Sequence, residues 1–310
     1  MTVTQSDTQS DRLYLPSGDC YLEANFNLAD LTTYRVGGPA QWFIAPHTTD
    51  QLQASVQWAS REGLPLTVLG AGSNLLISDR GLPGLVISTR HLRDQTFCEE
   101  TGIITVSAGK PLPRLCGQLA KQGWAGFEWA VGIPGTIGGA VVMNAGAHGE
   151  SISDSMVDAL ILDPDGTLHT LTNADLEYGY RSSKLQGQQS IVLSANFALN
   201  AGQPIEVVQA TTESHLNHRL STQPYDLPSC GSVFRNPLPK TAGWLIENSG
   251  LKGFTIGGAQ VAPKHANFIV NLGGAKAADI HALIFHVQKQ IEDRWALKLH
   301  PEVKILGNFD

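Results

Sequence analysis

Residues 132–146 read Gly-Ile-Pro-Gly-Thr-Ile-Gly-Gly-Ala-Val-Val-Met-Asn-Ala-Gly, and this stretch decides the fold. Its glycines stand among small apolar side chains, although each glycine in a regular element costs about 0.5–1 kcal/mol. We therefore expect bare backbone that approaches a large ligand and directs N–H groups at anionic oxygens. A second such segment, Gly70-Ala-Gly-Ser-Asn-Leu-Leu, follows the apolar run Leu66–Leu69. Together they predict a ligand held along its length, such as a dinucleotide, whereas tight turns would explain either segment alone.

The composition indicates a globular protein with few classes of partner. The 310 residues are enough for more than one domain, each with its own core. A net charge of −7 without any basic block argues against nucleic acid as a partner. Residues 1–12 do not resemble a signal peptide, and no apolar run reaches the ~18–20 residues of a membrane span. We expect a cytoplasmic protein, a monomer or weak oligomer, that binds neither nucleic acid nor a membrane.

The cysteines and histidines give no sign of a metal site. Neither a Cys-x-x-Cys pair nor a His-x-x-x-His pair occurs in the chain. This spacing indicates neither a disulfide framework nor a zinc site, so we expect no metal.

The chain divides into a tail and two mixed domains. Residues 1–30 are predicted to be a mobile tail followed by a short packed segment. Residues 31–202 alternate strands, helices and glycine loops, and Thr48-Thr-Asp-Gln matches a capping box that starts a helix. Strands are expected at 66–69, 85–88, 103–107, 159–162, 167–171 and 190–199, and a further helix at about 113–122.

Gln203-Pro204 marks the predicted boundary to a second domain over residues 203–310. Helices are expected there at 205–220, 241–248 and 277–296, and strands at 265–272 and 303–306. The apolar stripe of the 277–296 helix is typical of core packing rather than of a catalytic role. An irregular ordered segment, 221–240, separates the first two of these helices. The resulting class is mixed α+β.

The glycine segments match neither common nucleotide-binding motif. Leu75 stands where a Rossmann fingerprint requires glycine or alanine. No Gly-Lys-Ser/Thr follows a glycine loop, so a P-loop is absent too. A nucleotide would have to be bound by another fold.

Three polar side chains outside these segments are candidates for chemistry, each with a plainer explanation that stays open. Ser232 lies between a glycine and an apolar pair, where it could face an anionic substrate or stabilise a turn. Arg181 follows a short helix beside two tyrosines, where arginine is commonly a surface residue. Glu302 opens the last predicted strand, where it could form a simple ion pair with Lys304.

A series of motifs in fixed order covers about residues 25–308. It comprises the two glycine segments together with Tyr34-Arg-Val-Gly-Gly-Pro-Ala, Asn144-Ala-Gly-Ala, Tyr180-Arg-Ser-Ser, Pro228-Ser-Cys-Gly-Ser-Val-Phe-Arg-Asn-Pro, Ala242-Gly-Trp-Leu-Ile-Glu, Ile256-Gly-Gly-Ala-Gln-Val-Ala-Pro-Lys-His-Ala-Asn-Phe-Ile-Val-Asn and Pro301-Glu-Val. This series closely resembles the UDP-N-acetylenolpyruvoylglucosamine reductase family.

The resemblance implies a PCMH-type FAD-binding domain of two subdomains over 31–202. It also implies a separate α+β substrate-binding domain over 203–310, whose last strand returns to the active site. FAD would lie between the subdomains and would be non-covalent, because the first loop offers no histidine or cysteine for attachment. The FAD contacts that it implies are Gly70, Ala71, Gly72, Ser73, Asn74, Gly132, Pro134, Gly135, Thr136, Gly138, Gly139, Asn144, Ala145 and Gly146.

The implied activity is the NADPH-dependent, FAD-mediated reduction of UDP-N-acetylglucosamine enolpyruvate to UDP-N-acetylmuramate, a step of peptidoglycan precursor synthesis. NADPH would reduce the flavin, and the substrate would then replace the nicotinamide and receive the hydride. Arg181 would stabilise the developing enolate with Glu302 as its companion, and Ser232 would donate the quenching proton. The implied substrate-binding residues are Asn236 and Lys304, with Arg219 as a further candidate for a phosphate contact.

The resemblance is to the shorter family type, because too few residues follow Arg181 to hold the extra tyrosine-bearing loop of the other type. Two rival functions are weighed against the reductase. One is another PCMH-fold FAD oxidoreductase that acts on a sugar or hydroxy acid. The other is a nucleotide-sugar binding protein without turnover.

Overall fold

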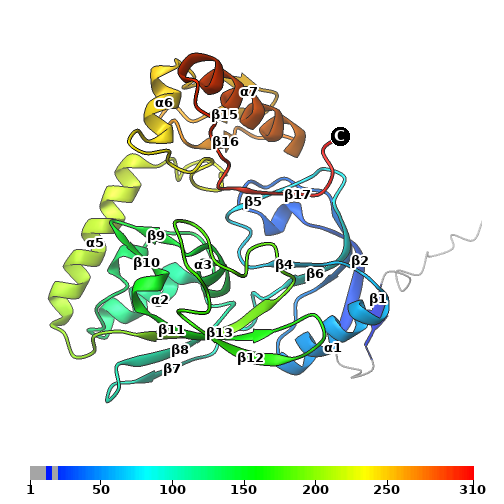
Figure 1. Ribbon diagram of the computed structural model, residues 1–310, viewed down its shortest axis with the longest axis vertical. Helices are drawn as coiled ribbons and strands as arrows, with labels where there is room; N and C mark the ends of the chain where they lie inside the picture. The colour runs from blue at the N-terminus through cyan, green and yellow to red at the C-terminus, as the bar shows by residue number, and fades with distance from the viewer. Residues whose placement is uncertain (1–11, 16–19) are drawn as a thin grey trace, which may run out of the picture.

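The computed structural model describes residues 12–15 and 20–310 (Figure 1). The tail predicted at the start of the chain falls largely on residues 1–11 and 16–19, which lie outside this description. In the described part, no helix is both long enough and apolar enough to cross a bilayer.

The first sheet contains five strands around a buried parallel centre. Their order is β1 (Arg12–Tyr14), β2 (Tyr21–Asn27), β3 (Pro39–Ile44), β6 (Leu82–Ser88) and β4 (Leu66–Leu69). Strands β3, β6 and β4 are parallel, and α1 (Thr49–Arg61) connects β3 to β4. All but one residue of β6 are buried, as expected for a parallel strand covered on both faces. Strand β2 pairs with β3, so the chain before residue 31 contributes an antiparallel strand to this sheet.

The start of α1 differs in one bond from the predicted capping box. Thr48 Oγ1 accepts the Gln51 backbone N–H at 3.2 Å, as the motif requires. The Gln51 side chain, however, accepts the His47 N–H at 2.8 Å instead of the Thr48 N–H. The motif therefore marks the helix start correctly, while its reciprocal bond reaches one residue further back.

The second sheet is antiparallel throughout. Its order is β12 (Leu168–Thr172), β11 (Met156–Leu162), β13 (Ile191–Ala198), β8 (Ile103–Ser107) and β7 (Gln95–Cys98). Helix α3 (Ile137–Met143) packs on β13 and β8, and α2 (Leu112–Lys121) adds to the same buried cluster. The two sheets correspond to two subdomains, and a shared apolar cluster joins them, in which residues of β3, β6 and α1 lie together with Leu162, Ile191 and Leu193 of the second sheet.

Helix α3 lies within the segment that the sequence predicts as an open glycine loop. The Gly138 N–H donates to the Ala108 carbonyl at 2.9 Å, and an added Cβ at Gly138 would stand 2.9 Å from the Ala108 Cβ. The glycine therefore allows the helix to pack tightly on the chain that leaves β8. The helix ends at Asn144, whose φ of +43° is a left-handed conformation that asparagine tolerates.

The C-terminal part is built on three helices and a small antiparallel sheet. The helices are α5 (Ile205–Thr222), α6 (Ala242–Asn248) and α7 (Ala277–Trp295), and the strands are β14 (Thr255–Ile256), β15 (Ala259–Val261) and β16 (Ile269–Asn271). The predicted core stripe of α7 is confirmed by its buried isoleucines, leucine and valine. The strand predicted at 265–272 is shorter, because Phe268 N–H bonds back to the His265 carbonyl in a turn.

The end of the chain returns to the first glycine loop. Strand β17 (Lys304–Leu306) runs parallel to β5 (Leu75–Ile77), and the two lie side by side below the C-terminal helices in Figure 1. The Lys304 N–H donates to the Asn74 carbonyl at 2.9 Å. The Asp79 carboxylate also accepts the N–H groups of Ala277 and Ala278, at 2.9 and 3.0 Å, in the first turn of α7. These bonds fix the C-terminal part against the chain on both sides of β5.

The remaining elements are short. They are β9 (Gly146–Ala147), β10 (Glu150–Ser151), α4 (Ile152–Ser155) and the 3-10 turns Ala29–Leu31 and Glu128–Ala130.

Candidate active site

The two glycine segments touch each other, although they lie far apart in the chain. Ser73 Oγ donates to the Pro134 carbonyl at 2.7 Å. Gly70 faces Thr136, and an added Cβ at Gly70 would collide with Thr136 Oγ1. Gly135 has a φ of +151°, and an added Cβ there would meet only Ser73 Oγ at 3.4 Å. The segments therefore form one continuous cradle between the two sheets.

This cradle carries hydrogen-bonding groups without protein partners. Within residues 12–15 and 20–310, the backbone N–H groups of Ala71, Gly72, Ser73 and Asn74 donate no hydrogen bond. Thr136 Oγ1 and Thr33 Oγ1 are buried and also lack a partner there. Buried polar groups are normally satisfied, and successive free N–H groups suit an anion. A large polar cofactor with a pyrophosphate, such as FAD, fits this donor set.

Some glycines of the set also serve protein packing. An added Cβ at Gly72 would collide with the Leu31 carbonyl, and one at Gly146 would stand 2.9 Å from Ser151 Cβ. Gly132 has a φ of +73° and lies under the Arg219 side chain. Gly139 is exposed, and the nearest atom to an added Cβ is Thr136 Oγ1 at 3.8 Å. Among the α3 glycines, the open space therefore lies at Gly139.

Beyond α3, Asn144 holds the neighbouring loops in place. Its Nδ2 donates to the Gly179 carbonyl at 3.0 Å, and its Oδ1 accepts the Ser153 N–H at 3.0 Å. The next residue, Ala145, packs partly buried against the core of the second sheet. Both predicted cofactor contacts thus have structural bonds or packing of their own.

Arg181 and Glu302 form an ion pair across the two domains. Arg181 Nε lies 3.1 Å from Glu302 Oε1, and both side chains are largely buried. The Arg181 guanidinium also donates to the carbonyl groups of Asn144 and Gly146. Arg181 has a φ of +54°, a left-handed conformation that is unusual for arginine and common at functional sites. Arg181 is therefore not a free surface arginine, and Glu302 forms its ion pair with Arg181 rather than with Lys304.

Three cations surround the single carboxylate. Burial raises the pKa of Glu302, and the positive charges of Arg181, Arg235 and Lys304 act in the opposite direction. Burial and the nearby Arg235 lower the pKa of Lys304. The excess of positive charge makes the site suited to an anionic group such as a substrate carboxylate.

Hydrogen bonds hold the segment that carries Ser232 next to this ion pair. The Glu302 N–H donates to the carbonyl of Val233 at 2.7 Å, and Arg235 Nη2 donates to the Arg181 carbonyl at 3.2 Å. The half-buried Ser232 hydroxyl makes no hydrogen bond to any described residue. The Ser232 hydroxyl therefore does not stabilise a turn through a hydrogen bond, as the plainer explanation of this serine would require.

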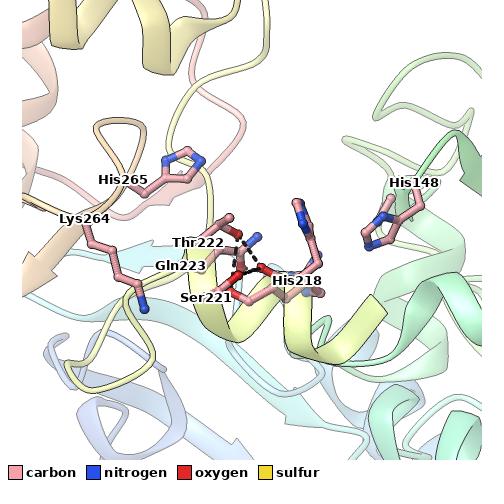
Figure 2. A pocket seen from close by; sticks show the side chains of 9 residues that line it. His148, His218, Ser221, Thr222, Gln223, Lys264 and His265 are labelled. Atoms are coloured by element: carbon pink, nitrogen blue, oxygen red, sulfur yellow. Dashed lines mark hydrogen bonds between the residues drawn. The ribbon is translucent and has the colours of Figure 1, made fainter. Parts of the chain in front are cut away.

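A cationic cavity of about 650 Å³ lies beside the end of α5. Figure 2 shows side chains of α5 between His148 of the β9–β10 hairpin and the loop that carries Lys264 and His265. Arg219 lines this cavity and also a smaller one of about 200 Å³. The smaller cavity reaches Thr33 and Pro134 of the cradle region and Ser229 and Gly231 of the serine segment. The two cavities thus extend from the predicted flavin site to the end of α5.

Arg219 is held in place by side-chain partners. Its Nε donates to Tyr225 Oη at 3.1 Å, and its Nη2 to Gln223 Oε1 at 3.2 Å. Tyr225 Oη in turn donates to the Gly132 carbonyl at 2.8 Å. This chain of bonds links the end of α5 to the second glycine segment.

Asn236 has a different environment from the other predicted substrate residues. Its Oδ1 accepts the Ala242 N–H at 3.0 Å, at the start of α6, and the residue is exposed. Lys304, by contrast, is half-buried and donates to Gln186 Oε1 at 2.7 Å.

Sequence reasoning missed several residues at this site. Arg235 and Lys264 lie within quoted motifs, so a search for cations in those motifs would have found them. Gln186 and His148 carry no sequence signal, because only the folded chain brings them to the site. Across the described ranges, no group of three or more metal-ligating side chains is arranged to hold a metal ion.

Comparison with known proteins identifies the family of both domains. Residues 40–172 match the FAD binding domain family, and residues 223–306 match the family of the UDP-N-acetylenolpyruvoylglucosamine reductase C-terminal domain. The chain is 60% identical over 297 residues to the UDP-N-acetylenolpyruvoylglucosamine reductase of Acaryochloris marina, covering 96% of each chain. It is 57% identical over 301 residues to that of Trichormus variabilis, covering 97% of this chain and 91% of the relative.

A solved structure shares the whole architecture. The crystal structure of the reductase from Thermus caldophilus superposes with a TM-score of 0.78 at 34% identity, covering 90% of this chain and 97% of that one. The α+β fold, with its FAD-binding and C-terminal domains, is thereby confirmed. The chain belongs to the UDP-N-acetylenolpyruvoylglucosamine reductase family.

Proposed function

We propose that this chain reduces the enolpyruvyl group of UDP-N-acetylglucosamine enolpyruvate to the lactyl ether of UDP-N-acetylmuramate, with FAD as cofactor and NADPH as reductant. The observation that carries the proposal is the Arg181–Glu302 pair, which lies among further cations. Hydrogen bonds connect this pair to the chain segments that form the cradle of free N–H groups. Bound FAD supplies the hydride, and the chain supplies binding, charge and a proton.

The cradle residues would hold the cofactor. The free N–H groups of Ala71–Asn74 would bind the pyrophosphate, and Thr136 Oγ1 would donate to or accept from a polar atom of FAD. Neither a histidine nor a cysteine occurs among these residues, which supports non-covalent binding. The division into a FAD-binding domain at 31–202 and a substrate domain at 203–310 is part of this proposal.

Arg181 would bind the substrate carboxylate and stabilise the negative charge that spreads into it as the enol ether is reduced. A fixed guanidinium in a half-buried site is well suited to this task, because its orientation requires no reorganisation during the reaction. Glu302 would keep Arg181 in place through the Nε–Oε1 bond. Arg235 and Lys304 would add positive charge on the same side.

Ser232 would donate the proton that completes the reduction at the carbon next to the carboxylate. Among the described residues, its hydroxyl has no hydrogen-bond partner that would compete with the substrate. A serine hydroxyl is a weak acid, so the surrounding cations would also stabilise the alkoxide as it forms.

The larger cavity would receive the phosphate end of the substrate. Arg219 lines it together with Lys264 and His218, which provide positive charge and hydrogen-bond donors. Asn236 would contact the substrate through its free amide nitrogen, since its oxygen is engaged with α6. We also propose that the protein is a monomer or a weak oligomer, that it lies in the cytoplasm and that it binds no nucleic acid.

Two measurements on the purified protein test this function. The visible spectrum should have the two flavin bands, and denaturation should release the flavin into the supernatant. NADPH oxidation should then depend on added UDP-N-acetylglucosamine enolpyruvate. A protein that binds this substrate without oxidising NADPH would be a binding protein, and rapid reoxidation of the reduced flavin by oxygen alone would favour an oxidase.

A further inference from the structure

Gln186 lies where the loop that carries Arg181 meets α3 and the last strand. Its Nε2 donates to the Arg181 carbonyl at 2.9 Å and to the Val142 carbonyl at 3.1 Å. Its Oε1 accepts from Lys304 Nζ at 2.7 Å. One half-buried amide thus joins three distant segments of the chain.

The chemistry of the partners fixes the orientation of this amide. Two carbonyl oxygens require the NH₂ group, and an ammonium group requires the oxygen. The opposite orientation would place N–H against Lys304 and oxygen against two carbonyls. Both ends of the side chain are therefore engaged in the same geometry.

Arg181 depends on such support because its backbone is left-handed, with a φ of +54°. Its carbonyl accepts from Gln186 Nε2 and from Arg235 Nη2, at 2.9 and 3.2 Å. A conformation that a non-glycine residue rarely adopts persists when the surrounding contacts determine it. That backbone sets the direction in which the Arg181 side chain leaves the chain, and the bonds to Glu302 and two carbonyls then orient the guanidinium.

We propose that Gln186 is a positioning residue for the reduction, which sets the Arg181 backbone and the Lys304 ammonium relative to each other. The inference rests on the proposed function, since it assumes that Arg181 and Lys304 face the substrate. Gln186 itself acts only through these two residues.

The loop has another attachment to α3, so Gln186 is not needed merely to hold it there. Ser183 Oγ donates to the same Val142 carbonyl at 2.7 Å. What Gln186 adds is the connection between Arg181 and Lys304. A loss of that connection should affect the step with the substrate rather than folding or flavin binding.

The test measures the two half-reactions of flavin-loaded protein by stopped flow. Gln186→Met keeps the shape of the side chain and removes all three bonds. Gln186→Glu keeps an acceptor for Lys304 and places carboxylate oxygens at the two carbonyls. In both variants we expect unchanged flavin content and unchanged flavin reduction by NADPH. Reoxidation by the enolpyruvyl substrate should be slower by about 10- to 100-fold, the range expected for misplaced binding groups.

The pH dependence of reoxidation separates positioning from general loosening. Burial and the charge of Arg235 lower the pKa of Lys304, and the charge of Glu302 raises it. A carboxylate at position 186 would also raise this pKa, because it favours the charged ammonium group. The loss of activity at high pH should therefore move to higher pH in Gln186→Glu than in Gln186→Met. The same high-pH limit in both variants would show that Lys304 is not positioned by this residue.

Two matched controls complete the design. Ser183→Ala removes a bond to the same carbonyl, and Gln188→Ala changes an exposed glutamine of the same loop. Neither should slow reoxidation selectively. If Ser183→Ala has the same effect as Gln186→Met, or if Gln186→Met lowers flavin content, the role is structural and the inference is wrong.

Failure of the proposed function has a different signature. If Arg181→Lys slows reoxidation while Gln186→Met does not, the positioning inference is overturned and the function stands. If neither variant affects reoxidation, the role of Arg181 itself is wrong.

Discussion

Arg181 combines three features that rarely occur together in a surface arginine. Its backbone is left-handed, its guanidinium bonds to a carboxylate and two carbonyls, and its own carbonyl is held by two side chains. The planar fork of the guanidinium meets these acceptors from several directions at once. The position is therefore specified by hydrogen-bond geometry as well as by charge.

Arg181→Lys tests this dependence on geometry. The ammonium keeps the charge but cannot reach Glu302 and the two carbonyls together. We expect kcat to fall strongly with a smaller change in substrate affinity, the signature of an interaction made mainly in the transition state. Steady-state kinetics with the enolpyruvyl substrate measures both quantities, and near-normal turnover would remove Arg181 from the mechanism.

Glu302 gives a prediction about stability and pH. Burial raises its pKa above the unfolded value, so the folded state is favoured while the carboxyl is protonated. That contribution is complete below the unfolded pKa of about 4.3 and is lost as pH rises through the folded pKa. Glutamine cannot ionise, so Glu302→Gln should gain stability relative to wild type across this window.

Urea unfolding of both proteins at a series of pH values measures the difference in free energy. It should grow in favour of the glutamine variant as pH rises from the unfolded pKa. A difference that stays constant or shrinks would mean that the Arg181 charge outweighs burial at this site.

At the scale of single residues, the sequence predicted the chemistry but not the network. The resemblance carried by the motif series predicted that Glu302 pairs with Arg181, and the structure contains that pair. Gln186 donates to the carbonyl of Arg181 on its own loop and to that of the distant Val142, and Arg235 donates to the carbonyl of the distant Arg181. No periodicity or spacing encodes such bonds, so the role of Gln186 could not be assigned in advance, whereas Arg235 lies in the quoted motif that carries Ser232.

Among the elements, α3 shows where sequence reasoning reached its limit. Glycines lower helix propensity, so a glycine-rich segment predicts a loop. Here the close packing of Gly138 on Ala108 outweighs that propensity and a short helix forms. The long α7 was predicted within one residue, because its apolar stripe repeats over many turns and is buried as a unit.

The two adjacent glycines of α3 should respond differently to the same substitution. Gly138→Val would press a side chain against Ala108, and overpacking of this kind typically costs about 1–3 kcal/mol. In Gly139→Val, the new side chain would point into open space beside Thr136. It should leave the fold intact while preventing the flavin from binding.

Thermal unfolding and the ratio of flavin to protein absorbance distinguish these outcomes. We expect a lower Tm for Gly138→Val and a folded, colourless protein for Gly139→Val. A Gly139→Val protein with a normal flavin ratio would show that this face of α3 does not meet the cofactor.

In the whole molecule, the site is assembled from segments that lie at both ends of the chain. The β4–β5 loop, the serine segment and β17 meet through the Lys304–Asn74 and Glu302–Val233 backbone bonds, and Arg181 connects them to the segment after α3. The α+β class and the domain families were correctly predicted, because motifs are distributed along almost the entire sequence. The pairing of β2 with β3 is more specific than the short packed segment predicted before residue 31.

The central claim is that Arg181, Ser232 and Glu302 act on the substrate in a flavin-loaded enzyme, and Ser232→Ala tests it most directly. Stopped-flow absorbance follows flavin reduction by NADPH and flavin reoxidation by UDP-N-acetylglucosamine enolpyruvate in separate experiments. Because Ser232 supplies a proton only in the second half-reaction, reduction should stay near wild type. Reoxidation should slow by about 100-fold or more, in the range of general acid catalysis. Equal impairment of both half-reactions, or normal reoxidation, would contradict this account.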